Sequence, residues 1–139
     1  MITYNLASDI STLVAVNREI SSNTTTNGAI IDIMGNMNGP VFTSQAIAYT
    51  DGSYQFKIFE SDDSAMADAT EVIPDQIVGD LADLSITSGP ATEGSVIKRV
   101  GVFDTKRYVR LSVVSTDVTD GATIISNVIQ TPKIVPSEV

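Results

Sequence analysis

The sequence VIKRVGVFDTKRYVRLSVV, residues 96–114, decides the fold of this chain. Two runs rich in β-branched and aromatic residues flank the short polar segment 104–106, a composition typical of two strands joined by a tight turn. In the second run Val109, Leu111 and Val113 fall on one face, which is the period of a strand with one buried side. The stretch therefore predicts a β-hairpin at the centre of an all-β domain.

A second hairpin is predicted over residues 41–59. Apolar residues alternate on both sides of Asp51-Gly52. Asp-Gly favours a type I′ turn, because both central residues of that turn need a positive φ. Thr119-Asp120-Gly121 predicts a further turn, followed by a last strand over residues 122–131.

Turn signals recur along the chain at a spacing of roughly ten residues, which is typical of a β-sandwich. We expect an antiparallel β-sandwich of about eight strands over residues 28–131, and periodicity leaves open whether it is jelly-roll-like or immunoglobulin-like. Residues 1–27 are polar and predict an N-terminal arm with one short strand, either a frayed terminus or a segment that orders against a neighbouring molecule. Residues 132–139 predict an extended C-terminal tail. Residues 65–94 mix short helical and strand signals and predict no single element.

Composition narrows the possible functions. The chain has 139 residues, enough for one domain with its own core. It has no cysteine and no histidine, which excludes disulfides, thiolate and imidazole metal ligands, cysteine nucleophiles and histidine bases. The net charge of −9 disfavours nucleic acid and anionic membranes as partners. We therefore expect no enzyme, no metal and no cofactor. No signal peptide is expected, because the first residues lack a basic region followed by an apolar run.

Basic residues concentrate between positions 98 and 110, where five of the eight lie. They predict either a positive patch that docks on an acidic partner or cross-strand pairs with carboxylates of the same sheet. Arg110 is the strongest candidate, because a guanidinium in the middle of a strand needs a fixed partner. The candidate partner-binding residues are Arg99, Lys106, Arg107, Tyr108 and Arg110.

Three other groups of residues have plainer interpretations. The acidic residues at 60, 62, 63 and 68 suggest calcium, but they lack the spaced Asp-x-Asp-x-Asp-Gly loop and fit a solvated turn better. Carboxylate pairs for glycoside hydrolysis can be drawn among residues 60, 80, 83 and 93, yet nothing in the sequence sets their separation. The aromatic residues on alternating strands fit core filling better than a sugar-stacking platform, and the chain has no tryptophan.

Six segments carry a resemblance through their order and spacing: AIID (29–32), AYTDGSY (48–54), FKIFESDD (56–63), KRVG (98–101), KRYVRL (106–111) and TDGATI (119–124). Together they resemble a family of small structural proteins of tailed bacteriophages. Members of this family look like capsid decoration, or cement, proteins with a jelly-roll sandwich. The resemblance covers residues 28–131.

The resemblance implies a non-enzymatic virion protein on the outer surface of an icosahedral capsid. Such a protein binds the major capsid protein, bridges its subunits and stabilises the assembled shell by mass action. It is assembled in the host cytoplasm and is expected to be a homo-oligomer, a dimer or a trimer. Two alternatives stay open at this point: a carbohydrate-binding module on the virion that adheres to the host surface, and a head–tail connector or tail component.

Overall fold

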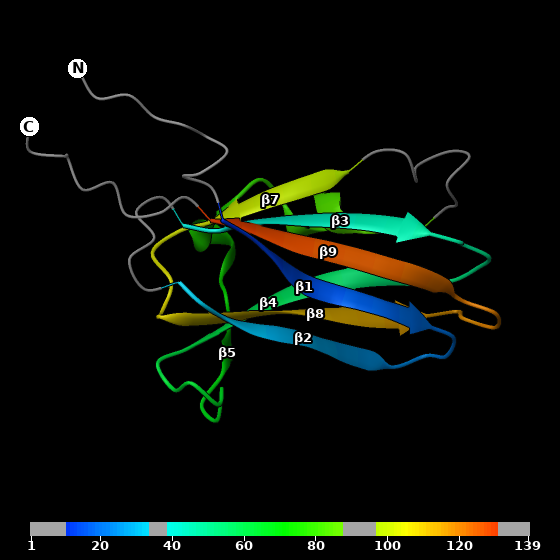
Figure 1. Cartoon of the computed structure of the whole chain (residues 1–139). Helices are drawn as coiled ribbons and strands as arrows, with labels where there is room; N and C mark the ends of the chain where they lie inside the picture. The colour runs from blue at the N-terminus through cyan, green and yellow to red at the C-terminus, as the bar shows by residue number, and fades with distance from the viewer. Residues whose placement is uncertain (1–10, 34–38, 88–96, 131–139) are drawn as a thin grey trace, which may run out of the picture.

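In the computed structural model, which describes residues 11–33, 39–87 and 97–130, the chain forms two antiparallel β-sheets packed face to face (Figure 1). The five-stranded sheet contains, in order, β1 (Ser11–Ile20), β9 (Ala122–Gln130), β3 (Val41–Ile47), β7 (Lys98–Val102) and β6 (Ile77–Val78). The four-stranded sheet contains β2 (Thr25–Asp32), β8 (Tyr108–Thr116), β4 (Ser53–Ser61) and β5 (Thr70–Glu71). Two short 3-10 helices, η1 (Pro74–Gln76) and η2 (Leu81–Leu84), flank β6. The predicted antiparallel β-sandwich is confirmed.

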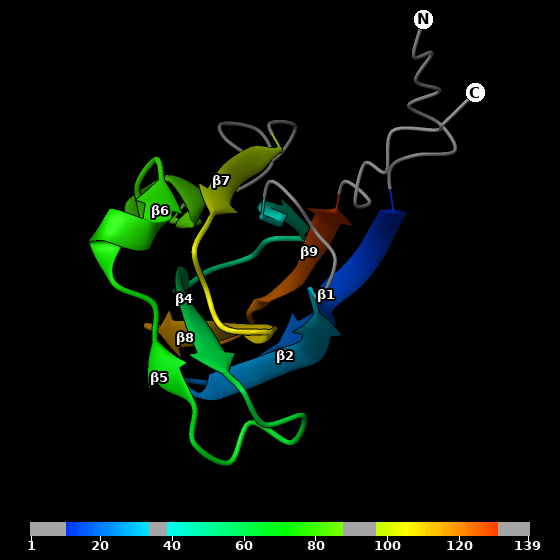
Figure 2. The same cartoon turned by 90° about the vertical axis from the view of Figure 1, so that its left-hand side faces the viewer.

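The long strands are connected as in a jelly roll. The connections β1 to β2, β2 to β3, β3 to β4, β7 to β8 and β8 to β9 each pass from one sheet to the other. The first and last strands are neighbours, because β1 pairs with β9 along its whole length. Two sets of four strands, β1-β9-β3-β7 and β2-β8-β4-β5, thus wind around one interior, which is jelly-roll topology. Figure 2 shows the two layers from their end.

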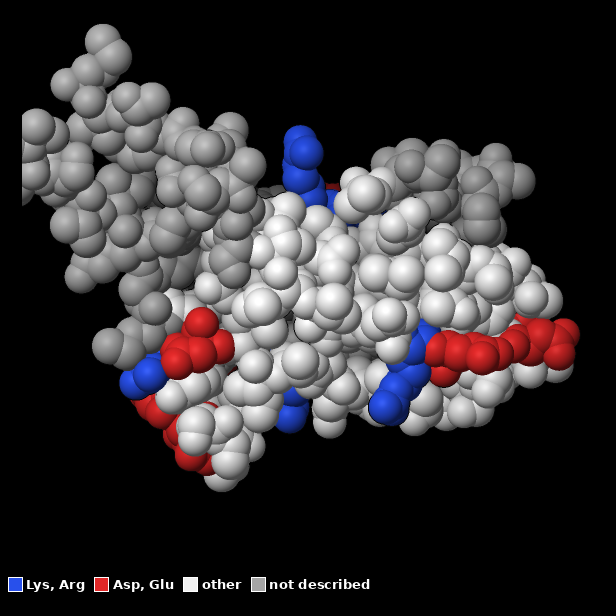
Figure 3. Space-filling view, in the orientation of Figure 1, with Lys and Arg blue, Asp and Glu red and all other residues white. Residues whose placement is uncertain are grey.

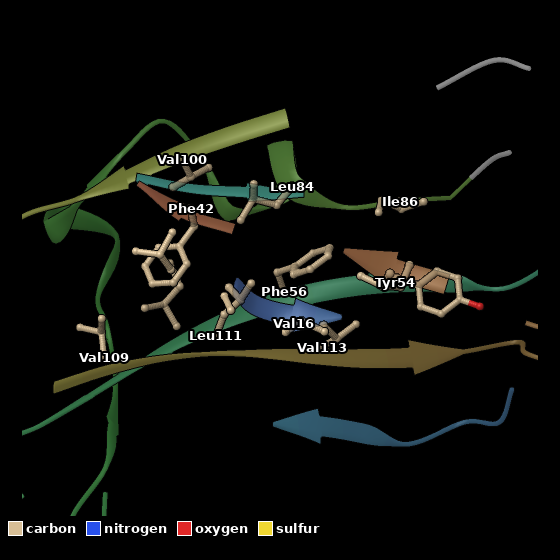
Figure 4. Close-up of a cluster of buried hydrophobic side chains, with 14 of the residues drawn as sticks. Val16, Phe42, Tyr54, Phe56, Leu84, Ile86, Val100, Val109, Leu111 and Val113 are labelled. Carbon is tan, nitrogen blue, oxygen red and sulfur yellow. The ribbon is translucent and has the colours of Figure 1, made fainter. Parts of the chain in front are cut away.

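The core lies between the two sheets and follows the period of two that the sequence predicts (Figure 4). Val109, Leu111 and Val113 of β8 are completely buried, and Phe42 of β3 meets them from the opposite sheet. Leu84 of η2 also enters the core, where its backbone carbonyl accepts a hydrogen bond from a buried serine of β3 at 2.8 Å. The buried face of β8 is therefore the one that the alternation selects.

The predicted hairpin over residues 96–114 is wrong, although both of its strands exist. β7 and β8 lie in different sheets, so their connection crosses the sandwich instead of turning back. Each strand pairs with segments distant in the chain: β7 with β3 and β6, and β8 with β2 and β4. Two backbone N–H groups hold the crossing segment, because Phe103 donates to the carbonyl of Gln76 (2.9 Å) and Lys106 donates to Oε2 of Glu60 (3.0 Å).

The predicted hairpin over residues 41–59 is wrong for a related reason. β3 ends at Ile47, and β4 begins at Ser53 in the other sheet. The carboxylate of Asp51 accepts the backbone N–H groups of residues 119, 120 and 121 at 2.9–3.2 Å. Asp51 therefore ties the β3–β4 connection to the β8–β9 connection. The turn predicted at residues 119–121 is present in that second connection, where Gly121 has a φ of 92°.

The sandwich begins earlier than the predicted boundary at residue 28. β1 and the first part of β2 fall within residues 11–27, and β1 is paired with β9 in the five-stranded sheet. The described part of the predicted arm is therefore part of the sandwich. Residues 1–10 and the predicted tail, 132–139, lie outside the described residues. In the segment 65–94, described as far as residue 87, the chain forms β5, η1, β6 and η2.

Both sides of the sandwich have strand edges that discourage pairing with another chain. On one side the edge strands β5 and β6 have only two residues each. On the other side β1 and β2 are adjacent and both carry a bulge, between Val14 and Val16 and between Asn27 and Ile30. Gly28 lies where they meet, since a Cβ there would come within 2.5 Å of the carbonyl oxygen of Ala15. Partners are therefore expected on the sheet faces and not on the edges.

Candidate interaction surface

The outer face of the four-stranded sheet carries most of the candidate residues, and we call it the charged face. Register places Ile30, Arg110 and Phe59 in one row across β2, β8 and β4. The next row contains Asp32 and Tyr108. Side chains in such rows are close enough to contact one another. The charged face is defined by Ile30, Asp32, Lys57, Phe59, Arg107, Tyr108 and Arg110.

Arg107 is paired within the molecule. Its Nε and Nη2 donate to the two carboxylate oxygens of Asp32 at 3.1 and 2.9 Å, and its guanidinium carbon lies 5.1 Å from the ring centroid of Tyr108. The hydrogen bonds to Asp32 raise the pKa of Arg107 above its usual value. For this residue the structure shows the cross-strand carboxylate pair that was one of the two expectations.

Arg110 is in a different situation. It is half-buried between its row neighbours Ile30 and Phe59. Its Nε is shielded from solvent and has no hydrogen-bond acceptor among the described residues. A buried donor without an acceptor is costly, so the guanidinium would gain a hydrogen bond if the side chain turned outward to an oxygen acceptor supplied from outside. The arrangement is that of a cation in an apolar frame, which is typical of an anchor residue in a protein interface.

The other two candidate cations differ in their distance from Arg110. Lys106 lies in the β7–β8 connection beside the carboxylate of Glu60, which accepts its backbone N–H. Arg99 is exposed on β7, opposite Thr43, on the outer side of the other sheet. The structure therefore brings together Lys106, Arg107, Tyr108 and Arg110 at one end of β8 and places Arg99 apart from them.

The acidic residues near β4 are used in local hydrogen bonds. Asp63 accepts the backbone N–H of Ala67 at 3.0 Å, and Asp68 accepts the hydroxyl of Ser61. The hydrogen bond from Ser61 lowers the pKa of Asp68. Within residues 11–33, 39–87 and 97–130, no three Asp or Glu side chains gather as a metal site. The arrangement is that of a hydrogen-bonded turn.

The aromatic residues are divided between the core and the surface. Tyr54 and Phe56 are buried, and Tyr54 packs edge-on against Tyr49 with ring centroids 6.3 Å apart. Phe59 and Tyr108 are half-buried on the charged face, and Phe103 is 44% exposed beyond the end of β7. These positions come from separate rows and separate sheets. They form no shared stacking platform in the described part of the chain.

The outer face of the five-stranded sheet was missed by the sequence analysis, and we call it the aliphatic face. Its rows across β1, β9 and β3 contain branched apolar and uncharged polar side chains. In these outward positions the charged residues that the structure describes are Glu19 on β1 and Arg99 on β7, at opposite sides. Figure 3 shows the uncharged area over β3, β9 and β1, with charges at its margins. The aliphatic face is defined by Val14, Val41, Ile47, Val78, Ile125 and Ile129.

The sequence did hold a signal for this face. Thr123, Ile125, Asn127 and Ile129 are the outward residues of β9, and none of them is charged. A strand exposed to water on one side usually has polar residues there, whereas Ile125 and Ile129 are apolar. The strand was predicted, and the apolar residues at two of its outward positions are the signal for this face.

Fold and surfaces together define the class of this protein: a jelly-roll sandwich with a filled interior and two unlike outer faces. Searches found no family model, no curated protein and no solved structure that matches the chain. None of the helices in the described residues has the length and apolar character to cross a membrane.

Proposed function

We propose that this protein is a non-enzymatic virion protein of a tailed bacteriophage. It binds the outer surface of the assembled capsid and stabilises it by bridging major capsid protein subunits. The proposal is supported by the resemblance over residues 28–131 and by the jelly-roll fold expected with it. It places the protein on the capsid exterior, after assembly in the host cytoplasm. The acidic net charge suits that position, because the exterior does not face the packaged DNA.

The observation that carries the proposal is the unpaired Nε of Arg110 in the charged face. A carboxylate or carbonyl of a capsid subunit supplies the missing acceptor when the Arg110 side chain turns outward to meet it. Ile30 and Phe59 exclude water around that contact and so strengthen it. Arg107 keeps its own partner, Asp32, and forms a polar rim beside the anchor.

The protein stabilises the capsid because its full set of contacts is available only on the assembled shell. A decoration protein that contacts more than one subunit binds neighbouring subunits better than separated ones, and so raises the free energy of disassembly. This action needs rigidity and adhesive faces and no active site. The blunted edges agree with it, because they leave the faces as the contact surfaces.

The experiment is a co-sedimentation assay with capsids that lack the protein. Purified full-length chain is added, bound protein is quantified in the pellet, and the temperature at which shells release DNA is measured. We expect saturable binding and a higher release temperature. Absence of co-sedimentation at any concentration would refute the proposal, and binding to a glycan array in its place would favour the adhesion alternative.

A matched pair of variants tests the assigned anchor. Arg110→Gln removes the guanidinium from the charged face, and Arg18→Gln makes the same charge change on exposed β1. We expect Arg110→Gln to weaken shell binding about 30-fold, the effect of losing an interface hot spot, and Arg18→Gln to change it little. Equal effects would mean that only net charge matters, and the anchor would then be wrongly assigned.

A further inference from the structure

Gly101 lies inside β7, on the outward side of the five-stranded sheet, between Val41 of β3 and Val78 of β6. A glycine inside a strand weakens it, and often marks a bulge, a tight bend or a place that another molecule approaches closely. The register is continuous on both sides of Gly101, and its φ is not positive. Among the described residues an added Cβ would meet only Val78, at 3.6 Å from its Cβ, which is an ordinary contact. The fold therefore does not require glycine at this position, and close approach from outside is the remaining explanation.

The side chains around Gly101 are an unpaired cation and exposed apolar groups. Val78 is 64% exposed, and Ile97, one residue before β7, is 60% exposed. Arg99, two residues from Gly101 and on the same side of β7, is also exposed. Neither ion pair that the structure describes includes Arg99. We call Val78, Ile97, Arg99 and Gly101 the β7 patch.

Charge selects the partner of the β7 patch. The chain has a net charge of −9, so Arg99 attracts an acidic group of another protein, while a second copy of the chain is repelled overall. The space left by the missing side chain of Gly101 takes an apolar side chain, which packs against Val41 and Val78. We infer that the β7 patch is a second docking site for a capsid subunit, one that presents a carboxylate to Arg99 and an aliphatic side chain to Gly101.

A second docking site explains how one copy of the chain bridges capsid subunits. The β7 patch and Arg110 lie on opposite sheets, as the positions of β7 and β8 show (Figure 2). One face alone holds the protein on a single subunit, whereas two faces that point away from each other reach neighbouring subunits. The choice of partner rests on the proposed function, because bridging is the action that requires two sites.

Gly101→Val tests the β7 patch by filling the space that the partner side chain needs. A β-branched residue favours a strand and a Cβ is tolerated here, so urea denaturation should show no loss in the free energy of unfolding. Binding to capsids, measured by co-sedimentation, should weaken about 10-fold. The temperature at which shells release DNA should fall to that of shells without the protein. Gly101→Ala is the matched control, because it fills less of the space and should weaken binding less.

Arg99→Gln tests the cation separately, and it leaves the core untouched because Arg99 is exposed. It should weaken binding to capsids about 10-fold. Arg18→Gln makes the same charge change on exposed β1 and should alter binding little. The double variant Arg99→Gln/Arg110→Gln lacks both cations and should not sediment with capsids.

The outcomes distinguish the β7 patch from the proposed function. A wild type that does not bind capsids would refute both. If the wild type binds, but Arg99→Gln and Gly101→Val bind and protect capsids equally well, the β7 patch is no docking site and the proposed function stands on the charged face alone. Equal weakening by Arg99→Gln and Arg18→Gln would also overturn the inference, since only net charge would then matter. A loss of stability in Gly101→Val would show that the fold does need this glycine.

Discussion

The two outer faces of the sandwich differ although the same core lies beneath both. The charged face has its ions in pairs across the strands, Arg107 with Asp32 and Lys57 with Glu71, and one arginine whose Nε lacks an acceptor among the described residues. Where the structure describes it, the middle of the aliphatic face has no ion pair, only branched apolar and uncharged polar side chains. Under the proposed function the first face makes the polar contact with a partner, whereas the second face offers apolar side chains for burial.

The largest effect is expected where the two sheets approach each other at β1 and β2. Gly28→Ala places a Cβ within 2.5 Å of the carbonyl oxygen of Ala15 and 2.7 Å of that of Leu111, so backbone must move. We expect the free energy of unfolding to fall by about 2–4 kcal/mol, measured by urea denaturation. Gly101→Ala on the aliphatic side is the control. Its nearest neighbour would be Val78 Cβ at 3.6 Å, an ordinary contact, and a comparable loss there would refute the explanation.

A second prediction concerns the pH dependence of stability. It compares a carboxylate that ties two sheet-to-sheet connections together with a carboxylate in a local surface turn. Hydrogen bonds from the backbone of residues 119–121 lower the pKa of Asp51 below 3.8 in the folded state. The folded state therefore binds this proton less well than the unfolded chain does, and the stability it contributes is present above the ordinary Asp pKa. That stability is lost as the pH falls through the lowered value.

Thermal unfolding from pH 6 to pH 2 tests this prediction. The midpoint of the wild type should fall on acidification, and Asp51→Asn should start lower and fall less steeply. Asp68→Asn serves as the comparison, because its pKa is lowered mainly by one hydroxyl and not by three backbone groups. We expect a smaller change in the slope for Asp68→Asn. Identical pH profiles for the wild type and Asp51→Asn would contradict the proposed clamp.

The sequence predicted strands better than it predicted their partners. The alternation of β8 depends on residues within one segment, and its buried face was predicted correctly. The pairing of β7 with β3, and of β8 with β2 and β4, depends on contacts between segments far apart in the chain. The motif at Asp51-Gly52 misled for the same reason. The Asp51 carboxylate accepts hydrogen bonds from the backbone of residues 119–121, and no local sequence pattern predicts this contact.

The candidate site shows the same contrast between features set within one segment and features set by contacts between distant segments. Lys106, Arg107, Tyr108 and Arg110 lie near one another because they share one strand and its entry. Arg99 was separated from them by the crossing between β7 and β8. The pairing of Arg107 with Asp32 required the register of β2 against β8, which the sequence does not give. To predict the aliphatic face, one would need the strand order of the whole five-stranded sheet.

A third, smaller effect tests whether Arg110 is kept for binding at a cost in stability. Arg110→Met retains an unbranched apolar stem between Ile30 and Phe59 and removes the unpaired donor. We expect the free energy of unfolding to rise by about 0.5–1.5 kcal/mol, while binding to capsids is weakened as in Arg110→Gln. A variant that is less stable than the wild type would mean that the guanidinium is satisfied within the molecule, and the contrast between the faces would lose its main support.

The smallest effect is expected for the exposed ion pair between Lys57 and Glu71. The two charged groups are 3.6 Å apart, and both side chains are close to half exposed. Because water and salt screen such a pair, Lys57→Gln should lower the free energy of unfolding by about 0.5 kcal/mol or less, and 1 M salt should remove the difference. A clearly larger loss, or a difference that persists in 1 M salt, would contradict the description of this pair as exposed and screened.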